Sequence, residues 1–148
     1  MCNEFLIVEK LDMEHLTRVE VTFGDCDPAG IVFYPNIFRW LDKTFHDWLK
    51  TAGGHAAICE QLDAIGLGLF DTKTQFHRPL TDGDILEVTL ALKIWNRKAI
   101  VLAYEGKVDG QLRFAAQETR GLFKRSSDAM FAAEVAPFRE VMEAVGQG

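Results

Sequence analysis

The chain has 148 residues, of which 48% are hydrophobic and 26% charged, and its formal net charge is -6. This composition predicts one globular domain over residues 1–148 with a sizeable core, and the negative charge argues against a general nucleic-acid binder, which normally carries a basic face. Its apolar runs are too short to cross a bilayer, and the N-terminal residues lack the features of a signal peptide. We therefore expect a cytoplasmic protein that binds neither nucleic acid nor membrane.

The first half of the chain predicts one strand and two helices. Residues 15–23 alternate loosely as a strand, with residues 1–14 as an N-terminal extension ahead of it. Residues 37–49 predict a helix whose apolar side chains, two tryptophans among them, cover most of its surface. Such a helix is typical of the centre of a fold. The pair Gly53-Gly54 ends it, and residues 55–65 predict a shorter second helix.

The second half of the chain is rich in predicted strands. Residues 67–78 form the first, and residues 100–108 and 112–124 form two more, separated by a hairpin turn at Asp109-Gly110. Between them, residues 84–94 alternate almost perfectly. This alternation places five apolar side chains on one face: Leu86, Val88, Leu90, Leu92 and Ile94.

The order of these elements predicts the fold class. One early helix followed by consecutive antiparallel strands indicates an α+β domain in which a sheet of about five strands wraps around the central helix. Pro137 then begins a terminal helix through about Val145. A curved open sheet leaves edge strands to be covered, so we expect a homo-oligomer, either a dimer or a tetramer.

The most informative segment is residues 23–36. Asp27-Pro28-Ala29-Gly30 fits a type I turn, with Asp first, Pro second and Gly fourth. The turn precedes the central helix, which we expect Tyr34 or Asn36 to cap. The positive end of that helix and its free N–H groups favour a developing negative charge close to Asp27. A carboxylate beside an electropositive backbone is the minimum apparatus for acyl transfer or ester hydrolysis, whereas a purely structural role in the loop is the alternative.

This segment, together with Arg39-Trp40-Leu41-Asp42, closely resembles the active-site segment of 4-hydroxybenzoyl-CoA thioesterases of the Pseudomonas type. The resemblance extends from about residue 18 to about residue 125 and is most specific from residue 23 to residue 42. It implies the hotdog fold, in agreement with the order of elements. It also implies an acyl-CoA thioesterase whose active sites lie at the interface of a dimer, often within a homotetramer, and which needs no cofactor and no metal beyond its coenzyme A substrate.

The resemblance implies catalytic roles for two residues. Asp27 attacks the thioester carbon to give an acyl-enzyme anhydride, or activates water as a general base; both routes remain open. The backbone N–H of Tyr34 polarises the thioester oxygen at the helix end.

The resemblance further implies roles in substrate binding. Asp42 accepts a hydrogen bond from a ring hydroxyl of the acyl group, although a solvated carboxylate paired with Arg39 or His46 is an equal alternative. Arg97 and Lys98 match part of a basic run that holds the phosphates of coenzyme A in the family. Asn96 replaces an arginine of that run, which should weaken this binding or transfer part of it to another cation such as Arg125.

Three further observations limit the alternatives. Cys26 adjoins Asp27, but no histidine is near it in sequence, so we expect a small buried residue rather than a nucleophile. The histidines show no metal-binding signature. Residues 67–76 are expected to line the acyl pocket. We therefore predict a thioesterase for an aromatic acyl-CoA such as 4-hydroxybenzoyl-CoA or benzoyl-CoA, with a thioesterase for aliphatic acyl-CoA or a non-catalytic acyl-CoA-binding module as the alternatives.

Overall fold

The computed structural model describes residues 13–145. Apart from its last two residues, the predicted extension over residues 1–14 therefore lies outside the described residues. The described part forms, in chain order, β1 (Glu14–Glu20), the 3₁₀-helix η1 (Phe23–Asp25), α1 (Pro35–Lys50), α2 (His55–Leu62), β2 (Gly66–Phe76), β3 (Ile85–Trp95), β4 (Ile100–Val108), β5 (Gln111–Ser126), β6 (Ala129–Ala133) and α3 (Ala136–Val145).

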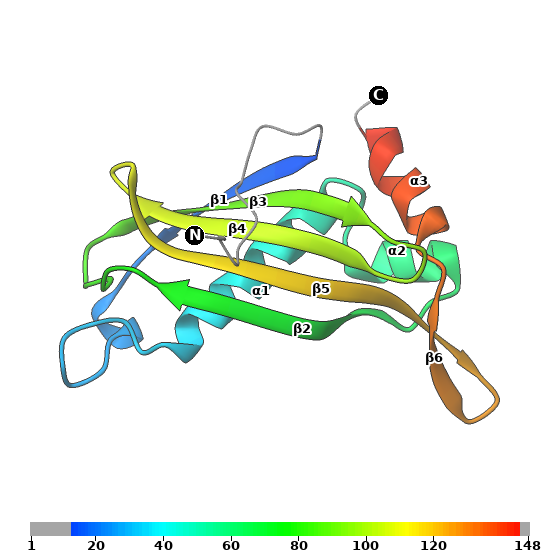
Figure 1. Ribbon diagram of the computed structural model, residues 1–148, viewed down its shortest axis with the longest axis horizontal. Coiled ribbons are helices and arrows are strands. Elements are labelled where there is room, and N and C mark those ends of the chain that lie inside the picture. The colour runs from blue at the N-terminus through cyan, green and yellow to red at the C-terminus, as the bar shows by residue number, and fades with distance from the viewer. Residues whose placement is uncertain (1–12, 146–148) are drawn as a thin grey trace, which may run out of the picture.

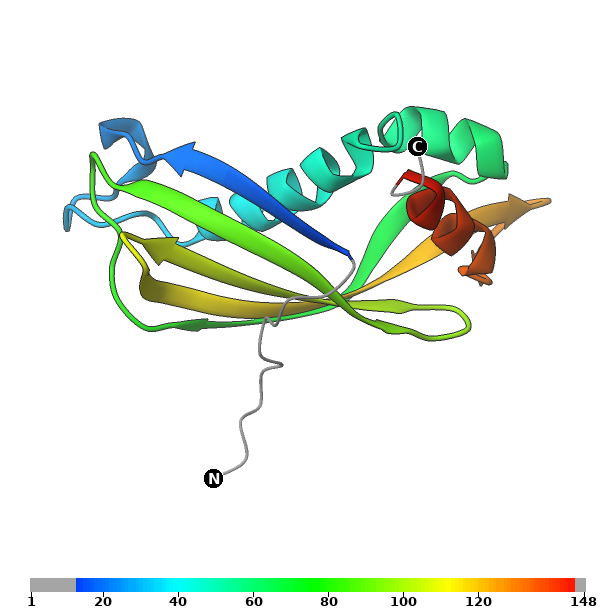
Figure 2. The same cartoon turned by 90° about the horizontal axis from the view of Figure 1, so that it is seen from above.

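The strands form one antiparallel sheet that curves around α1. Their order is β1-β3-β4-β5-β2, and β6 pairs with the end of β5. Figure 1 shows α1 lying along the sheet, and Figure 2 shows that it occupies the concave side, with α2 and α3 together at one end. The α+β architecture with a sheet wrapped around the central helix is therefore as predicted.

The core lies between α1 and the inner face of the sheet. Leu41, Phe45 and Leu49 are fully buried on α1, and they pack in one cluster with the inner side chains of β3, β4 and β5. Burial of each such side chain contributes about 1.5–3 kcal/mol to stability. The wide apolar surface of α1 thus holds the helix in place, with its first turn close to the loop that contains Asp27.

The structure corrects some of the predicted boundaries. β1 ends at Glu20 instead of residue 23, because the side chains of Thr22 and Asp25 form a capping box that starts η1. The helix expected over residues 55–65 ends at Leu62, where Asp63 adopts a left-handed conformation with φ of 52°.

Two further differences concern the sheet. The prediction that Ile94 shares the inner face is wrong, because the register shifts between Leu92 and Ile94 and the latter is exposed. The short strand β6 was not predicted. It follows a tight turn in which Ser127 has a φ of 53°.

Candidate active site

The loop before α1 is a small hairpin with Asp27 at its turn. Cys26 and Val32 form an isolated bridge, and the Asp27 carbonyl accepts a 2.9 Å hydrogen bond from the N–H of Gly30. Oδ1 of Asp27 accepts a second one from the N–H of Ala29, also at 2.9 Å. Gly30 has a φ of 82°, a conformation that side chains disfavour. The predicted turn at residues 27–30 is therefore present.

The carboxylate of Asp27 is half-buried and makes few polar contacts with the rest of the protein. Among residues 13–145 it forms no ion pair, and the N–H of Ala29 is its hydrogen-bond donor. Asp25, two residues earlier, differs: its carboxylate accepts hydrogen bonds from the N–H and hydroxyl of Thr22 at 2.9 and 3.0 Å and pairs with Arg39 at 3.2 Å. Asp25 shapes the loop, whereas Asp27 keeps acceptor capacity for a reacting molecule.

The start of α1 presents one unpaired backbone donor. Tyr34 is the N-cap residue, and its side chain makes no capping hydrogen bond. Asn36 is not a cap: it lies in the first helical turn, and its Nδ2 donates to the carbonyl of Asp25 at 2.9 Å. Pro35 has no N–H, and the N–H of Tyr34 has no partner among the described residues. This N–H thus stands free at the positive end of the helix.

A cavity of about 460 Å³ adjoins this helix start. Tyr34 is one of its lining residues, and most of the others are apolar: Ile31, Val32, Ile37, Phe76, His77, Arg78, Pro79 and Leu80. The hydrogen bond from the N–H of Val32 to the carbonyl of Leu80, at 2.8 Å, fixes one wall. The residue with the free N–H therefore borders a mostly apolar space large enough for an acyl group.

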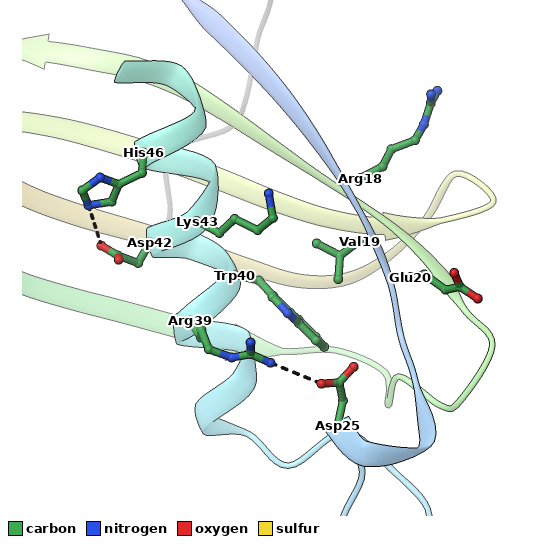
Figure 3. A pocket seen from close by; sticks show the side chains of 9 residues that line it. All are labelled: Arg18, Val19, Glu20, Asp25, Arg39, Trp40, Asp42, Lys43 and His46. Atoms are coloured by element: carbon green, nitrogen blue, oxygen red, sulfur yellow. Dashed lines mark hydrogen bonds and ion pairs between the residues drawn. The ribbon is translucent and has the colours of Figure 1, made fainter. Parts of the chain in front are cut away.

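Asp42 lies on α1, and its side chain is 57% exposed. Its Oδ1 is 3.7 Å from Nε2 of His46 and accepts a hydrogen bond from Nη2 of Arg120 at 3.1 Å. Pairing with Arg39 does not occur, because Arg39 binds Asp25 instead. Figure 3 shows the Asp42–His46 and Arg39–Asp25 pairs along a cleft of about 580 Å³ between β1 and α1.

Sequence reasoning missed Arg120 and the buried carboxylate of Glu118 beside it. Both side chains lie on the inner face of β5, with Arg120 5% and Glu118 4% exposed. The sequence indicates their burial once the register of β5 is known. Glu118 and Arg120 lie on the same face of this strand as Ala116 and Leu122, which are buried and apolar.

Arg97 and Lys98 lie in the turn between β3 and β4, as predicted, and Asn96 closes the turn with a hydrogen bond to Ala99. Nε of Arg97 donates to Glu134 at 2.8 Å, and Lys98 is exposed. This turn lies at the opposite end of the sheet from the start of α1 (Figure 1). The 11 residues of β3 span about 35 Å at about 3.3 Å per residue. One protomer therefore does not bring these cations to Asp27.

The remaining candidates give little further chemistry. Burial, with Asp82 nearby, raises the pKa of the Cys26 thiol, which keeps it protonated and argues against a nucleophile. The hydroxyls of Thr72 and Thr74, on β2, are buried and have no hydrogen-bond partner in the part of the chain that the structure describes. Within residues 13–145, no three His, Cys, Asp or Glu side chains gather as a metal site would require, and no helix has the length and apolar content to span a membrane.

Comparison with known proteins assigns the family. The profile of the thioesterase-like superfamily matches residues 21–145. The chain belongs to this superfamily. The predictions of a thioesterase and of the hotdog fold are thereby confirmed.

Individual relatives support this assignment. The chain is 29% identical to 4-hydroxybenzoyl-CoA thioesterase of Pseudomonas sp. (strain CBS-3) over 123 residues, which cover 78% of this chain and 86% of that protein. It is 26% identical to 1,4-dihydroxy-2-naphthoyl-CoA hydrolase of Prochlorococcus marinus (strain MIT 9313) over 104 residues, 66% of this chain and 69% of that one. A crystal structure of a 4-hydroxybenzoyl-CoA thioesterase mutant with bound 4-hydroxybenzoyl-CoA superposes with a TM-score of 0.78 at 27% identity, covering 87% of this chain and 98% of that chain.

Proposed function

We propose that this thioesterase hydrolyses an aromatic acyl-CoA, such as 4-hydroxybenzoyl-CoA or benzoyl-CoA, to the free acid and coenzyme A without a cofactor. One observation supports the proposal above all. The same loop carries the Asp27 carboxylate, which accepts a hydrogen bond from the N–H of Ala29, and the free N–H of Tyr34 at the start of α1. The first is a nucleophile or base, and the second is an oxyanion donor.

The chemistry follows from these two groups. The N–H of Tyr34 binds the thioester oxygen, so that the carbonyl carbon becomes more electrophilic and the developing oxyanion is stabilised. Asp27 either attacks that carbon, expelling the thiolate and forming an anhydride that water cleaves, or removes a proton from an attacking water. Loss of one well-aimed oxyanion donor typically lowers a rate by about 10²–10³-fold, so the helix start matters as much as the carboxylate.

An aromatic acyl group is favoured by two observations. Both relatives described above carry names of hydroxylated aryl-CoA substrates. In this chain, the inner face of β2 also carries the buried hydroxyls of Thr72 and Thr74, which have no partner among the described residues and pair in register with Glu118 and Ala116. The region beside α1 therefore has polar groups as well as apolar ones. In this proposal Asp42, which lines the cleft between β1 and α1, accepts a hydrogen bond from a hydroxyl of the acyl ring.

The binding of coenzyme A supports a dimer. Because Arg97 and Lys98 lie at the far end of the sheet from Asp27, we propose that the phosphates of a substrate held at Asp27 bind these cations on a second protomer. A two-fold axis beside the edge strand β2 would pair the β2 strands antiparallel and bring opposite ends of the two sheets together.

The first test is thiol release from benzoyl-, 4-hydroxybenzoyl- and aliphatic acyl-CoA esters. We expect the aryl esters to be hydrolysed fastest and Asp27→Asn to lower their turnover by about 10²–10⁴-fold. Tyr34→Phe, which keeps the backbone N–H, is the control and should change turnover little. Faster turnover of aliphatic esters would overturn the aryl assignment, and tight binding without turnover would leave a non-catalytic acyl-CoA-binding module.

A further inference from the structure

A buried chain of polar groups leads from the interior of the sheet to Asp42. The hydroxyl of Tyr104, on β4, donates a 2.6 Å hydrogen bond to Oε1 of Glu118. Nε of Arg120 donates to the same oxygen at 2.9 Å, and Nη2 of Arg120 donates to Oε2 at 3.3 Å. Nη2 also donates to Oδ1 of Asp42 at 3.1 Å. Asp42 and Arg120 are separated by 78 residues in the chain.

The guanidinium of Arg120 is held in one orientation. Two hydrogen bonds to Glu118, along one edge of the guanidinium, fix the plane of that group. The ring of Phe45 lies under it, with Cζ 4.0 Å from the ring centroid, a cation–π distance. Burial alone would lower the pKa of Arg120, but the carboxylate of Glu118 and the phenol of Tyr104 outweigh it, so that this pKa is raised. Burial raises the pKa of Tyr104 well above its usual range, so both side chains keep their protons at physiological pH.

This anchoring has a consequence for Asp42. An exposed aspartate on a helix normally samples several rotamers, but here Oδ1 is tied to a rigid buried donor while Oδ2 has no hydrogen-bond partner among residues 13–145. A carboxylate oxygen of this kind accepts hydrogen bonds from a ligand and donates none. Asp42 therefore presents one oriented acceptor oxygen at the surface.

We infer that Arg120 is a positioning residue for substrate specificity: by fixing Asp42 it selects acyl groups that carry a hydrogen-bond donor, such as a ring hydroxyl, over unsubstituted rings. This inference rests on the proposed function and deepens it. Glu118 and Tyr104 support Arg120 from behind, and a ring bearing a carboxylate is rejected because Asp42 would repel it.

The experiment compares kcat/KM for 4-hydroxybenzoyl-CoA with kcat/KM for benzoyl-CoA, two substrates that differ by one hydroxyl. We expect the wild type to prefer the hydroxylated ester and Asp42→Ala to lower this ratio by about 10- to 100-fold, the range for a hydrogen bond to a charged group. Arg120→Gln should lower the ratio by a comparable factor while turnover of benzoyl-CoA changes little. Arg120→Lys, which keeps the charge but loses the planar fork, should restore the ratio in part.

Removal of Arg120 alone leaves the buried Glu118 without its cation, and that variant is at risk of unfolding. The double variant Glu118→Gln/Arg120→Gln removes both charges and keeps an acceptor for Tyr104. It should fold, as circular dichroism would verify, and it should show the same loss of preference. Asp47→Ala, on the same helix but paired with Lys43 and Thr17, is the matched control and should leave the ratio unchanged.

Any of three results would overturn the inference alone. The first two are folded Arg120 variants that keep the wild-type ratio and folded variants that lose activity toward both substrates equally. A wild type that hydrolyses the aryl esters with no preference for the hydroxyl would do the same. A wild type that hydrolyses no aryl-CoA ester would overturn the proposed function, and this inference with it.

Discussion

Asp25 and Asp27 illustrate how a single residue acquires its role from its hydrogen-bond partners. The two carboxylates are two positions apart in the same loop, yet Asp25 is bound by Thr22 and Arg39. Within the described part of the chain, the carboxylate of Asp27 accepts a hydrogen bond only from the N–H of Ala29. A carboxylate whose lone pairs are already used by the protein is a poor nucleophile or base. We therefore propose Asp27 as the carboxylate that takes part in the chemistry, and its position depends on the turn that holds it.

Gly30 provides the test of that dependence. At a φ of 82° an alanine is strained by about 1–2 kcal/mol, although open space surrounds the added methyl group. We expect Gly30→Ala to lower the free energy of unfolding by about that amount. It should also reduce kcat more than KM, because relief of the strain moves Asp27. Urea unfolding and steady-state kinetics measure the two effects.

Gly24→Ala is the matched control, because Gly24 lies in the same loop with equally open space and no positive φ. It should leave both stability and kcat close to those of the wild type. A Gly30→Ala variant that behaves like Gly24→Ala would show that the turn conformation does not matter for catalysis.

At the scale of elements, His55 connects α2 to the start of β2. Its Nε2 accepts a hydrogen bond from the N–H of Leu67 at 3.2 Å, and its ring lies 5.4 Å from that of His46 on α1. Burial lowers the pKa of His55, and the nearby side chains of His46 and Arg120 lower it further, against the opposing effect of Asp42. The hydrogen bond and the lowered pKa agree, since only the neutral ring can accept from Leu67.

This arrangement predicts how stability depends on pH. The folded state binds a proton on His55 less readily than the unfolded state does. The contribution of His55 to the free energy of unfolding is therefore complete above about pH 6.5, and it is lost as the pH falls through and below that value. His55→Gln keeps an acceptor for Leu67 and should flatten the decline, as measured by urea unfolding between pH 8 and pH 5. His15→Gln on β1 should retain the wild-type slope; equal slopes in all three proteins would contradict the assignment.

How far the sequence predicts the elements depends on whether their cause is local. The wide apolar surface of α1, the alternation of β3 and the turn at residues 27–30 are each encoded in adjacent residues, and the structure contains all three. The bulge that turns Ile94 outward and the anchoring of Asp42 by Arg120 depend on pairings between distant segments. No local pattern carries that information, so the register and this part of the candidate site could not be predicted.

At the scale of the whole molecule, β2 is the feature that a single protomer leaves incomplete. It is an edge strand of 11 residues with exposed apolar side chains on Leu69, Phe70 and Phe76. A long edge of this kind favours pairing with another strand. A two-fold axis there would bring the start of α1 on one protomer toward the β3–β4 turn of the other, which is the arrangement that the proposed site requires.

Mixing two impaired variants tests whether the site is shared between protomers. In a hybrid of Asp27→Asn with Arg97→Gln/Lys98→Gln, one of the two shared sites combines a native Asp27 from one protomer with native cations from the other. We expect co-refolded mixtures to regain activity at low acyl-CoA concentration, up to about a quarter of the wild-type value for random pairing in two-fold dimers. Each variant refolded alone should stay impaired, and light scattering should report at least a dimer. Activity in the mixture that equals the average of the separate variants would place Asp27, Arg97 and Lys98 in the same protomer's site and exclude the shared arrangement.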